Sequence, residues 1–295
     1  MGSGSWNSQS FDTYTTNTRG ISLEDYETSN FSTQEIFTSH SLDPALNPYN
    51  VMRECCDSDE HPHSFPIILC PDVTGSMGSA ARKVAQKLNE LMTQLYEDNS
   101  VEDPEFCVIA IGDVAYDEAP IQMTQFESDV RIAEQLDKVY FEGGGGGNGF
   151  ESYSAALYMG LYHCALDCWK RGKKGLIITM GDECPNPYIP RHLGAITGDK
   201  LQGDIETKEL LREAQEKFEV YHISVDDSDT CYSWYKNRYN IDEKWRNLLG
   251  DHYKVATLDS LIPTIVEIIK EAHGQDTAVA YVPNVQLDEN SEICW

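Results

Sequence analysis

Short apolar runs alternate with amphipathic segments along the chain from residue 66 onward. Five runs are rich in aliphatic and β-branched residues and short enough to be buried strands: 67–70, 106–112, 175–180, 219–225 and 253–258. Between the first two, apolar residues recur every three or four positions, at Ala80, Val84, Leu88, Leu91, Met92 and Leu95. Continuous apolar strands alternating with such helices are typical of a parallel sheet covered on both faces. The pattern predicts a three-layer, doubly wound α/β fold with a mostly parallel sheet, similar to Rossmann-type folds.

Three later segments repeat the helical spacing. Their apolar positions fall at Ala156, Met159, Leu161, Cys164 and Cys168, at Leu210, Leu211, Ala214 and Phe218, and at Ile262, Ile265, Val266 and Ile269. The last helix is expected near residues 261–272. Sheets of this kind bind ligands beyond the carboxyl ends of their strands, so residues that directly follow a strand are the candidates for function.

The two ends of the chain differ from this pattern. Residues 1–50 are rich in Ser, Thr and Asn, which predicts an extended or partly disordered arm. Aromatic residues recur in it, so we expect the arm to dock on its own domain or on a neighbouring subunit. Residues 51–65 are expected to be a connector and 66–272 the main domain. Residues 273–295 form a C-terminal extension with one plausible strand at 277–282.

Composition narrows the class of protein. The formal charge of −27, from 49 acidic against 22 basic residues, argues against nucleic acid and suits attraction of divalent cations. No apolar stretch approaches the ~20 residues of a membrane span, and residues 1–17 do not read as a secretory signal. The nine cysteines lie mostly in apolar patterns, as at Cys70, Cys107, Cys164 and Cys168. Reduced thiols of this kind predict a cytoplasmic protein.

A carboxylate and two hydroxyls follow the first predicted strand. Residues 72–78 read Asp-Val-Thr-Gly-Ser-Met-Gly, and a helix is expected to begin there. Asp72, Thr74 and Ser76 would point one anionic and two neutral oxygens at a single place just past the strand. Clusters made only of oxygen suit hard cations, above all Mg²⁺.

Two more loops are expected at the same edge of the sheet. Residues 143–147 are five consecutive glycines, which allow close backbone approach and positive φ, and Asn148 and Glu151 follow where a helix should start. The strand at 175–180 is followed by Gly181 and Asp182, again a carboxylate. Three loops thus present oxygen ligands at one place, which predicts a cation site.

These loops resemble the metal-ion-dependent adhesion site of von Willebrand factor A domains, and the resemblance covers residues 66 to about 272. It is closest to the branch found beside α-kinase domains and in bacterial and phage proteins, whose loops read D-x-T-G-S-M-G, G-G-G-D-x-P-E and D-x-P. Residues 112–121, which include Asp113, also resemble that branch. Asn148 stands where the branch usually carries Asp, which removes one negative charge and should weaken cation binding. In the third loop, Gly181 stands ahead of Asp182, which shifts the register of this loop relative to the D-x-P pattern of the branch.

The resemblance implies the roles of these residues. Ser76 and either Thr74 or Asn148 would bind the ion directly, with Asp72 and Asp182 near it or acting through water. Glu151 and Asp113 are possible additional metal residues or lie behind the ligands. The implied ion is Mg²⁺, or else Mn²⁺ or Ca²⁺. Such sites leave one position open, which an acidic side chain of a partner protein fills, so the implied function is adhesion-type protein binding and not catalysis.

Other interpretations of the same residues remain open. Asp72 and Ser76 can be helix caps and the glycine run a plain loop. Cys55, Cys56, His61 and His63 have the residue types of a zinc site, but adjacent cysteines are poor tetrahedral partners. Cys184 beside Asp182 would be a nucleophile only with a suitably placed histidine, which no spacing indicates. The glycine run lacks the Lys-Ser/Thr of a phosphate loop.

The extensions suggest a second function of a different class. The chain would then be a structural subunit of a homo-oligomeric phage or bacterial assembly, in which the arm interlocks neighbours. No residue pattern supports an enzyme, and neither a membrane nor a nucleic acid is expected as partner.

Overall fold

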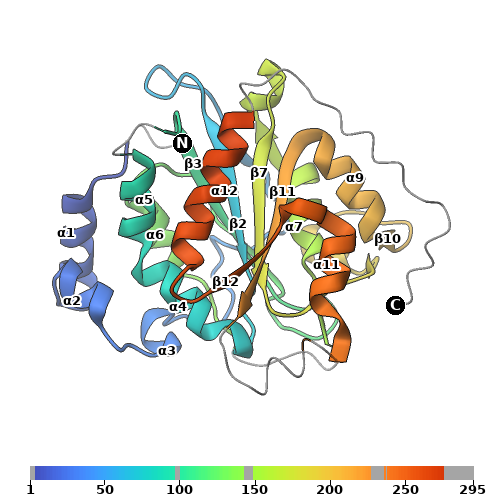
Figure 1. The fold of residues 1–295 in the computed structure, drawn as a ribbon, viewed down its shortest axis with the longest axis horizontal. Coiled ribbons are helices and arrows are strands. Elements are labelled where there is room, and N and C mark those ends of the chain that lie inside the picture. The colour runs from blue at the N-terminus through green and yellow to red at the C-terminus, as the bar shows by residue number, and fades with distance from the viewer. Residues whose placement is uncertain (1–3, 97–99, 143–148, 227–235, 237, 276–295) are drawn as a thin grey trace.

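The computed structural model describes residues 4–96, 100–142, 149–226, 236 and 238–275. A central sheet of six strands has the order β12-β11-β7-β2-β3-β4 (Figure 1). The strands are β2 (Phe65–Pro71), β3 (Pro104–Ile111), β4 (Ile121–Met123), β7 (Gly175–Gly181), β11 (Phe218–Asp226) and β12 (Tyr253–Thr257). All neighbours pair in parallel except β3 and β4. The predicted α/β class, the mostly parallel sheet and all five predicted strands are confirmed.

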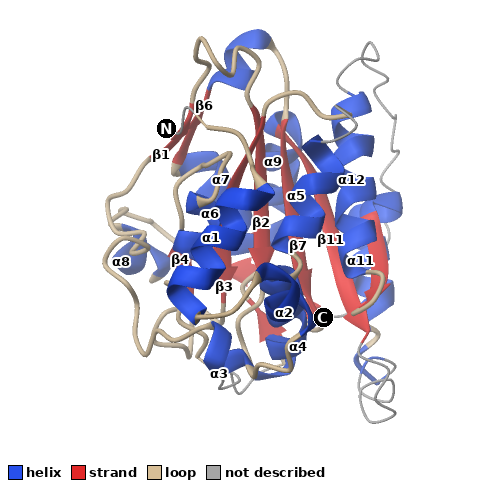
Figure 2. Ribbon diagram, turned by 90° about the vertical axis from the view of Figure 1, so that its left-hand side faces the viewer, coloured by secondary structure: helices blue, strands red, loops and turns tan. Residues whose placement is uncertain are grey.

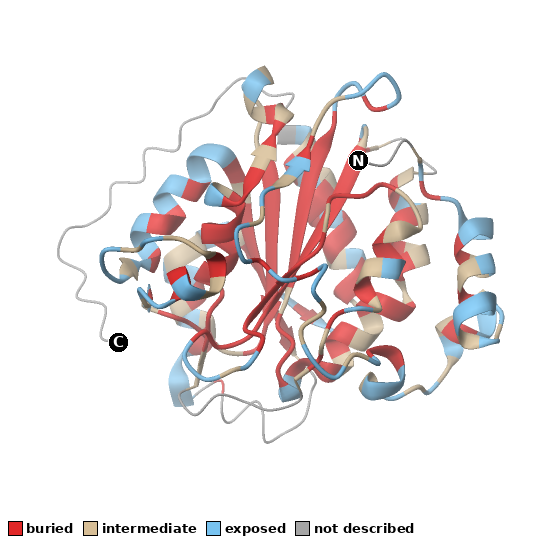
Figure 3. Ribbon diagram, turned by 180° about the vertical axis from the view of Figure 1, so that it is seen from behind, coloured by how far each residue is buried: buried red, intermediate tan, exposed pale blue. Residues whose placement is uncertain are grey.

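Helices cover both faces of this sheet (Figure 2). One layer contains α4 (Gly78–Gln86), α5 (Leu88–Tyr96), α6 (Arg131–Leu136) and α12 (Leu261–Gln275). The other contains α7 (Ser154–Tyr162), α9 (Thr207–Lys217) and α11 (Ile241–Leu249). The inner strands and the inner helix faces are buried, and the outer helix faces are exposed (Figure 3).

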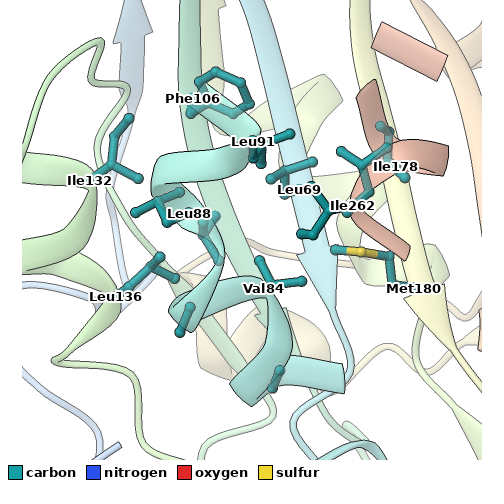
Figure 4. Packing of buried hydrophobic residues seen from close by; sticks show 14 of the residues in the cluster. Leu69, Val84, Leu88, Leu91, Phe106, Ile132, Leu136, Ile178, Met180 and Ile262 are labelled. Atoms are coloured by element: carbon teal, nitrogen blue, oxygen red, sulfur yellow. The ribbon is translucent and has the colours of Figure 1, made fainter. Parts of the chain in front are cut away.

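Alternate residues of each strand feed the two cores, as the two-residue period of a strand requires. From β2, Leu69 joins the core under α4, α5 and α12, while Ile68 joins the core under α7. Figure 4 shows the first core, in which Leu69 and Ile178 from the strands meet Leu88 and Ile262 from the helices.

Several short elements complete the described chain: β1 (Arg53–Cys55), η1 (Gly75–Met77), β5 (Phe150–Glu151), β6 (Cys164–Leu166), η2 (Asp167–Arg171), β8 (Cys184–Pro185), β9 (Tyr188–Ile189), α8 (Leu193–Thr197), β10 (Ile205–Glu206) and η3 (Gly250–His252). No helix within the described ranges has the length and apolar character needed to cross a bilayer.

Two predicted helices have different bounds in the structure. The period from Ala80 to Leu95 spans two helices, which meet at Lys87. The period that included Cys164 and Cys168 ends at Tyr162, because the backbone of the next residues pairs with β1. The spacing of apolar residues alone could not show where this helix ends. Both cysteines are buried as predicted, but Cys164 lies on β6 and Cys168 on η2. Phe218, expected at the end of a helix, begins β11.

The N-terminal arm is helical, which corrects the expectation of an extended segment. It forms α1 (Ser8–Arg19), α2 (Leu23–Thr28) and α3 (Thr33–Ile36), which lie along the side of α4, α5 and α6 (Figure 1). Its polar residues serve as caps: Asn7, Ser22 and Ser32 each accept a backbone N–H at a helix start. Its aromatic residues supply the buried contacts, namely Trp6, Phe11, Tyr26 and Phe37.

The arm docks on its own domain, one of the two placements expected, and an exchange between subunits stays a prediction. The connector at 51–65 contains β1. Helix α12 extends past the predicted end at residue 272 as far as Gln275. The strand predicted at 277–282 lies outside the described residues.

Candidate metal centre

The loop that follows β2 is held between the ends of two neighbouring strands. The Asp72 N–H donates to the Met180 carbonyl at the end of β7, at 2.9 Å. The Val73 N–H donates to the Ile111 carbonyl at the end of β3, also at 2.9 Å. The loop therefore leaves the sheet at its carboxyl edge, and η1 and α4 follow directly, as the sequence predicted.

Asp72 lies at the bottom of this site, with a side chain that is 0% exposed. Its Oδ1 accepts hydrogen bonds from the Thr74 N–H at 2.8 Å and from the Thr74 hydroxyl at 2.6 Å. Its Oδ2 accepts one from the Tyr153 hydroxyl at 3.1 Å. The carboxylate is thus fixed in orientation, although no basic side chain is among these three donors.

The first and third loops meet above Asp72. Ser76 lies on η1 and is exposed, and its hydroxyl donates to Asp182 Oδ1 at 3.1 Å. Asp182 follows β7 and is only 5% exposed. The structure therefore brings four of the predicted ligands to one edge of the sheet: Asp72, Thr74, Ser76 and Asp182.

Tyr153, at the start of α7, connects these loops and was not identified from the sequence. Its hydroxyl donates to Asp72 and accepts the Glu183 N–H at 3.3 Å. Gly181 makes room for it, because a Cβ at this position would lie 1.9 Å from the Tyr153 hydroxyl oxygen. Tyr153 therefore gives a steric reason for the glycine that stands ahead of Asp182 in the third loop. Gly181 is the signal in the sequence for this contact, but the spacing of residues could not identify Tyr153 as its partner.

The electrostatics of the site favour a cation. Burial, and then the neighbouring Asp182, raise the pKa of Asp72 to about 7. Burial also raises the pKa of Asp182, against the lowering effects of its hydrogen bond from Ser76 and of the Lys236 ammonium. Two buried carboxylates in mutual repulsion are stabilised when a divalent ion lies beside them.

Glu151 and Asp113 lie on the adjacent loops. Glu151 is 4% exposed, and its Oε2 has no hydrogen-bond partner among the residues that the structure describes. Burial and the nearby carboxylates of Asp72, Asp117 and Asp113 raise its pKa to about 10. Asp113 is buried and accepts the Ala115 N–H at 2.8 Å, which makes it a residue that shapes the loop.

The second predicted loop is only partly described. Asn148 and the glycine run at 143–147 lie outside the described residues, so the role expected for Asn148 stays a prediction. Within the part of the chain that the structure describes, no group of three or more His, Cys, Asp and Glu side chains forms a metal cage. The donor set is instead two carboxylates and two hydroxyls, which fits Mg²⁺ because that ion retains several waters.

The other candidate residues have separate partners. Cys55 is buried beside Glu105 and Ser64, and burial raises the pKa of its thiol. His61 Nε2 lies 3.1 Å from the Gly4 carbonyl, and His63 Nδ1 lies 2.9 Å from Glu102 Oε1. Cys184 Sγ lies 3.6 Å from Lys244 Nζ, and burial raises the pKa of its thiol.

Comparison with known proteins places the fold. No family model and no curated protein matches the chain. Among solved structures, it is similar to the pilus adhesin SpaC from Lactobacillus rhamnosus GG, with a TM-score of 0.52 and 15% identity over 77% of this chain and 31% of SpaC. The chain thus spans about a third of the length of that protein. The likeness concerns the fold alone.

Weaker matches include two other proteins. One is the vWF domain of the type V pili tip protein Mfa5 from Porphyromonas gingivalis, with a TM-score of 0.47 and 10% identity over 74% of this chain and 98% of that one. The other is proximal thread matrix protein 1 from the mussel byssus with a zinc-occupied MIDAS motif, with a TM-score of 0.43 and 12% identity over 74% of this chain and 48% of that one.

The chain is thus an α/β domain similar in fold to the pilus adhesin SpaC. The six-stranded, mostly parallel sheet and the helices on both its faces define this class. The branch suggested by the loop sequences stays a prediction.

Proposed function

We propose that this chain is a metal-ion-dependent protein-binding domain. A divalent cation, Mg²⁺ or else Mn²⁺ or Ca²⁺, is held at Asp72, Thr74, Ser76, Asn148 and Asp182. It captures the acidic side chain of a partner protein at a coordination position that the chain leaves open. The protein acts by binding and not by catalysis.

The contact between Ser76 and Asp182 carries this proposal. It joins an exposed hydroxyl from one loop to a nearly buried carboxylate from another, and that carboxylate raises the pKa of a second buried carboxylate, Asp72. A helix cap would need no such connection between loops, because a capping side chain bonds the backbone of its own helix. The exposure of Ser76 supports access for a partner's carboxylate.

The remaining properties of the proposal rest on sequence and burial. The excess of acidic residues supports attraction of cations and of partners with basic surroundings. Homo-oligomer formation stays an expectation. We also expect that the protein binds neither a membrane nor a nucleic acid. We propose a cytoplasmic location because the described cysteines are free thiols and most are buried.

Mn²⁺ binding followed by water-proton relaxation tests the open position. Bound Mn²⁺ should enhance relaxation through its remaining waters, and added acetate should lower the enhancement by displacing one of them. Acetamide, which has the same shape and no charge, should change it little. If acetate and acetamide act alike, the cation does not capture carboxylates and the proposed function fails.

Ser76→Ala should weaken Mn²⁺ binding about ten-fold or more, the usual range for loss of a group that supports a metal site. Ser79→Ala is the matched control, because Ser79 lies in the first turn of α4 beyond the loop. Equal affinity in the two variants would show that Ser76 is not a ligand.

A further inference from the structure

The N-terminal arm packs against the helix that begins at the candidate metal loop. Arg82, at the middle of α4, donates from Nη1 to the Phe31 carbonyl at 3.0 Å. Gln86, at the end of α4, donates from Nε2 to the carbonyls of Tyr26 and Ser29 at 3.1 and 3.0 Å. It also donates to the Ser29 hydroxyl at 2.8 Å. The arm therefore holds α4 along its length through hydrogen bonds to arm backbone.

The arm also lies close to the start of α4, two residues after Ser76. A Cβ at Gly78 would lie 2.9 Å from Thr33 Oγ1 of the arm helix α3. It would lie 3.7 Å from ring atoms of Phe141. Gly78 directly follows η1 and begins α4, so a displacement of Gly78 away from Thr33 would move η1, and Ser76 with it, relative to Asp182.

The arm also contacts the segment that leads into the second loop. Phe37 stacks on Phe141 with ring centroids 5.8 Å apart, and both rings are buried. Ser39 forms a parallel bridge with Tyr140. Phe141 is followed by Glu142, whose carboxylate accepts the Glu118 N–H at 3.0 Å. One short stretch of arm, residues 29–39, thus touches the supports of two of the three loops.

We infer that this stretch of the N-terminal arm is a positioning element for the cation site, which sets the affinity for the ion by fixing the start of α4. The inference rests on the proposed function, since it concerns the same site. By thermodynamic linkage the coupling acts in both directions, so cation binding should tighten the docking of the arm. A partner that displaced the arm would lower cation affinity, and the arm would then regulate binding.

A steric wedge tests this in the full-length chain. Gly78 has φ −54° and ψ −41°, which alanine adopts readily in a helix, so Gly78→Ala introduces a methyl group without backbone strain. The methyl group pushes against Thr33 Oγ1, and we expect Mn²⁺ affinity to fall about five-fold, equivalent to ~1 kcal/mol. Thr33→Ala alone removes the same contact and serves as the reference for the double variant. Thr33→Ala added to Gly78→Ala removes the obstructing oxygen and should restore affinity to within about two-fold of the unaltered protein.

Two further measurements separate positioning from a general loss of structure. Tyr14→Phe removes the bond from the Tyr14 hydroxyl to Asp137, 2.6 Å long, at the part of the arm that packs on α6, and should leave affinity unchanged. Hydrogen exchange should show that saturating Mn²⁺ increases protection of the amides of α2 and α3, less so in Gly78→Ala.

The possible results discriminate between the two proposals. If Gly78→Ala weakens Mn²⁺ binding and the added Thr33→Ala does not restore it, the methyl group acts on the metal loop itself. The inference that the arm positions the cation site is then wrong, while the proposed function stands. If Gly78→Ala binds Mn²⁺ as tightly as the unaltered protein, the arm inference is also wrong. If the unaltered protein binds no Mn²⁺, the proposed function fails and the arm has no cation site to position.

Discussion

Asp72→Asn should abolish cation binding and, in chelator, raise the melting temperature of the protein. The carboxylate is completely buried, with its pKa raised to about 7 by burial and by Asp182, so its charged form opposes folding. Asparagine keeps the shape and can accept the two bonds from Thr74. Stabilisation of about 1–2 kcal/mol would raise the melting temperature by roughly 2–3 °C for a chain of this size. Calorimetry with and without Mg²⁺ measures both effects.

The effect of Asp72 on the stability of the folded protein depends on pH. Unfolded Asp72 loses its proton near its ordinary pKa of 3.8, whereas the folded protein holds the proton until about pH 7. Folding therefore becomes less favourable as pH rises between these values and levels off above them. The advantage of Asp72→Asn in chelator should grow over the same window.

Asp259→Asn is the matched control for Asp72→Asn. The Asp259 carboxylate is 97% exposed and lies 3.4 Å from Lys83, so the same chemical change should alter the melting temperature little and leave cation binding intact. A lower melting temperature for Asp72→Asn in chelator would show that the buried charge does not oppose folding.

Gly181→Ala should be the most damaging single methyl addition in the site. The new Cβ would lie 1.9, 2.5 and 2.6 Å from Oη, Cζ and Cε1 of Tyr153, closer than any tolerated contact. Tyr153 is 2% exposed and packed edge-on against Trp245, so withdrawal of its ring would disturb that packing. We expect a loss of about 3 kcal/mol or more in the free energy of unfolding, together with loss of Mn²⁺ binding.

Gly203→Ala provides the comparison, because a Cβ at Gly203 meets no atom of the described residues within 4 Å. Chemical denaturation of the two variants measures the difference directly. Equal stability would mean that Tyr153 does not occupy the space in front of Gly181, and the connection it makes between the loops would be wrong.

Sequence reasoning was strongest where hydrophobic periodicity and strand ends decide the structure. The five strands and the meeting of Asp72, Thr74, Ser76 and Asp182 all follow from continuous apolar runs that end in oxygen-bearing residues. Parallel strands bring such ends to one edge whatever the loop lengths between them. The ligand role that the sequence predicts for Asn148 stays a prediction, because this residue lies outside the described residues.

It was weakest where contacts distant in sequence decide the structure. The helical arm is stabilised by the packing of its aromatic residues against α5 and α6, and the sequence of residues 1–50 does not indicate which helices they contact. Tyr153 resembles an ordinary core residue until Gly181 and Asp72 are seen beside it. The short pairing of β1 with β6 overrides the helical spacing at Cys164 for the same reason.

Crystals grown with Mn²⁺ offer the most direct test of the proposed cation site. Anomalous scattering from the metal should give one strong peak at the carboxyl edge of the sheet, within coordination distance of the Ser76 hydroxyl and beside Asp72 and Asp182. Asp72→Asn crystals grown in the same way should lack it. A peak elsewhere on the acidic surface, or none at this edge in protein that is fully folded, would contradict the account.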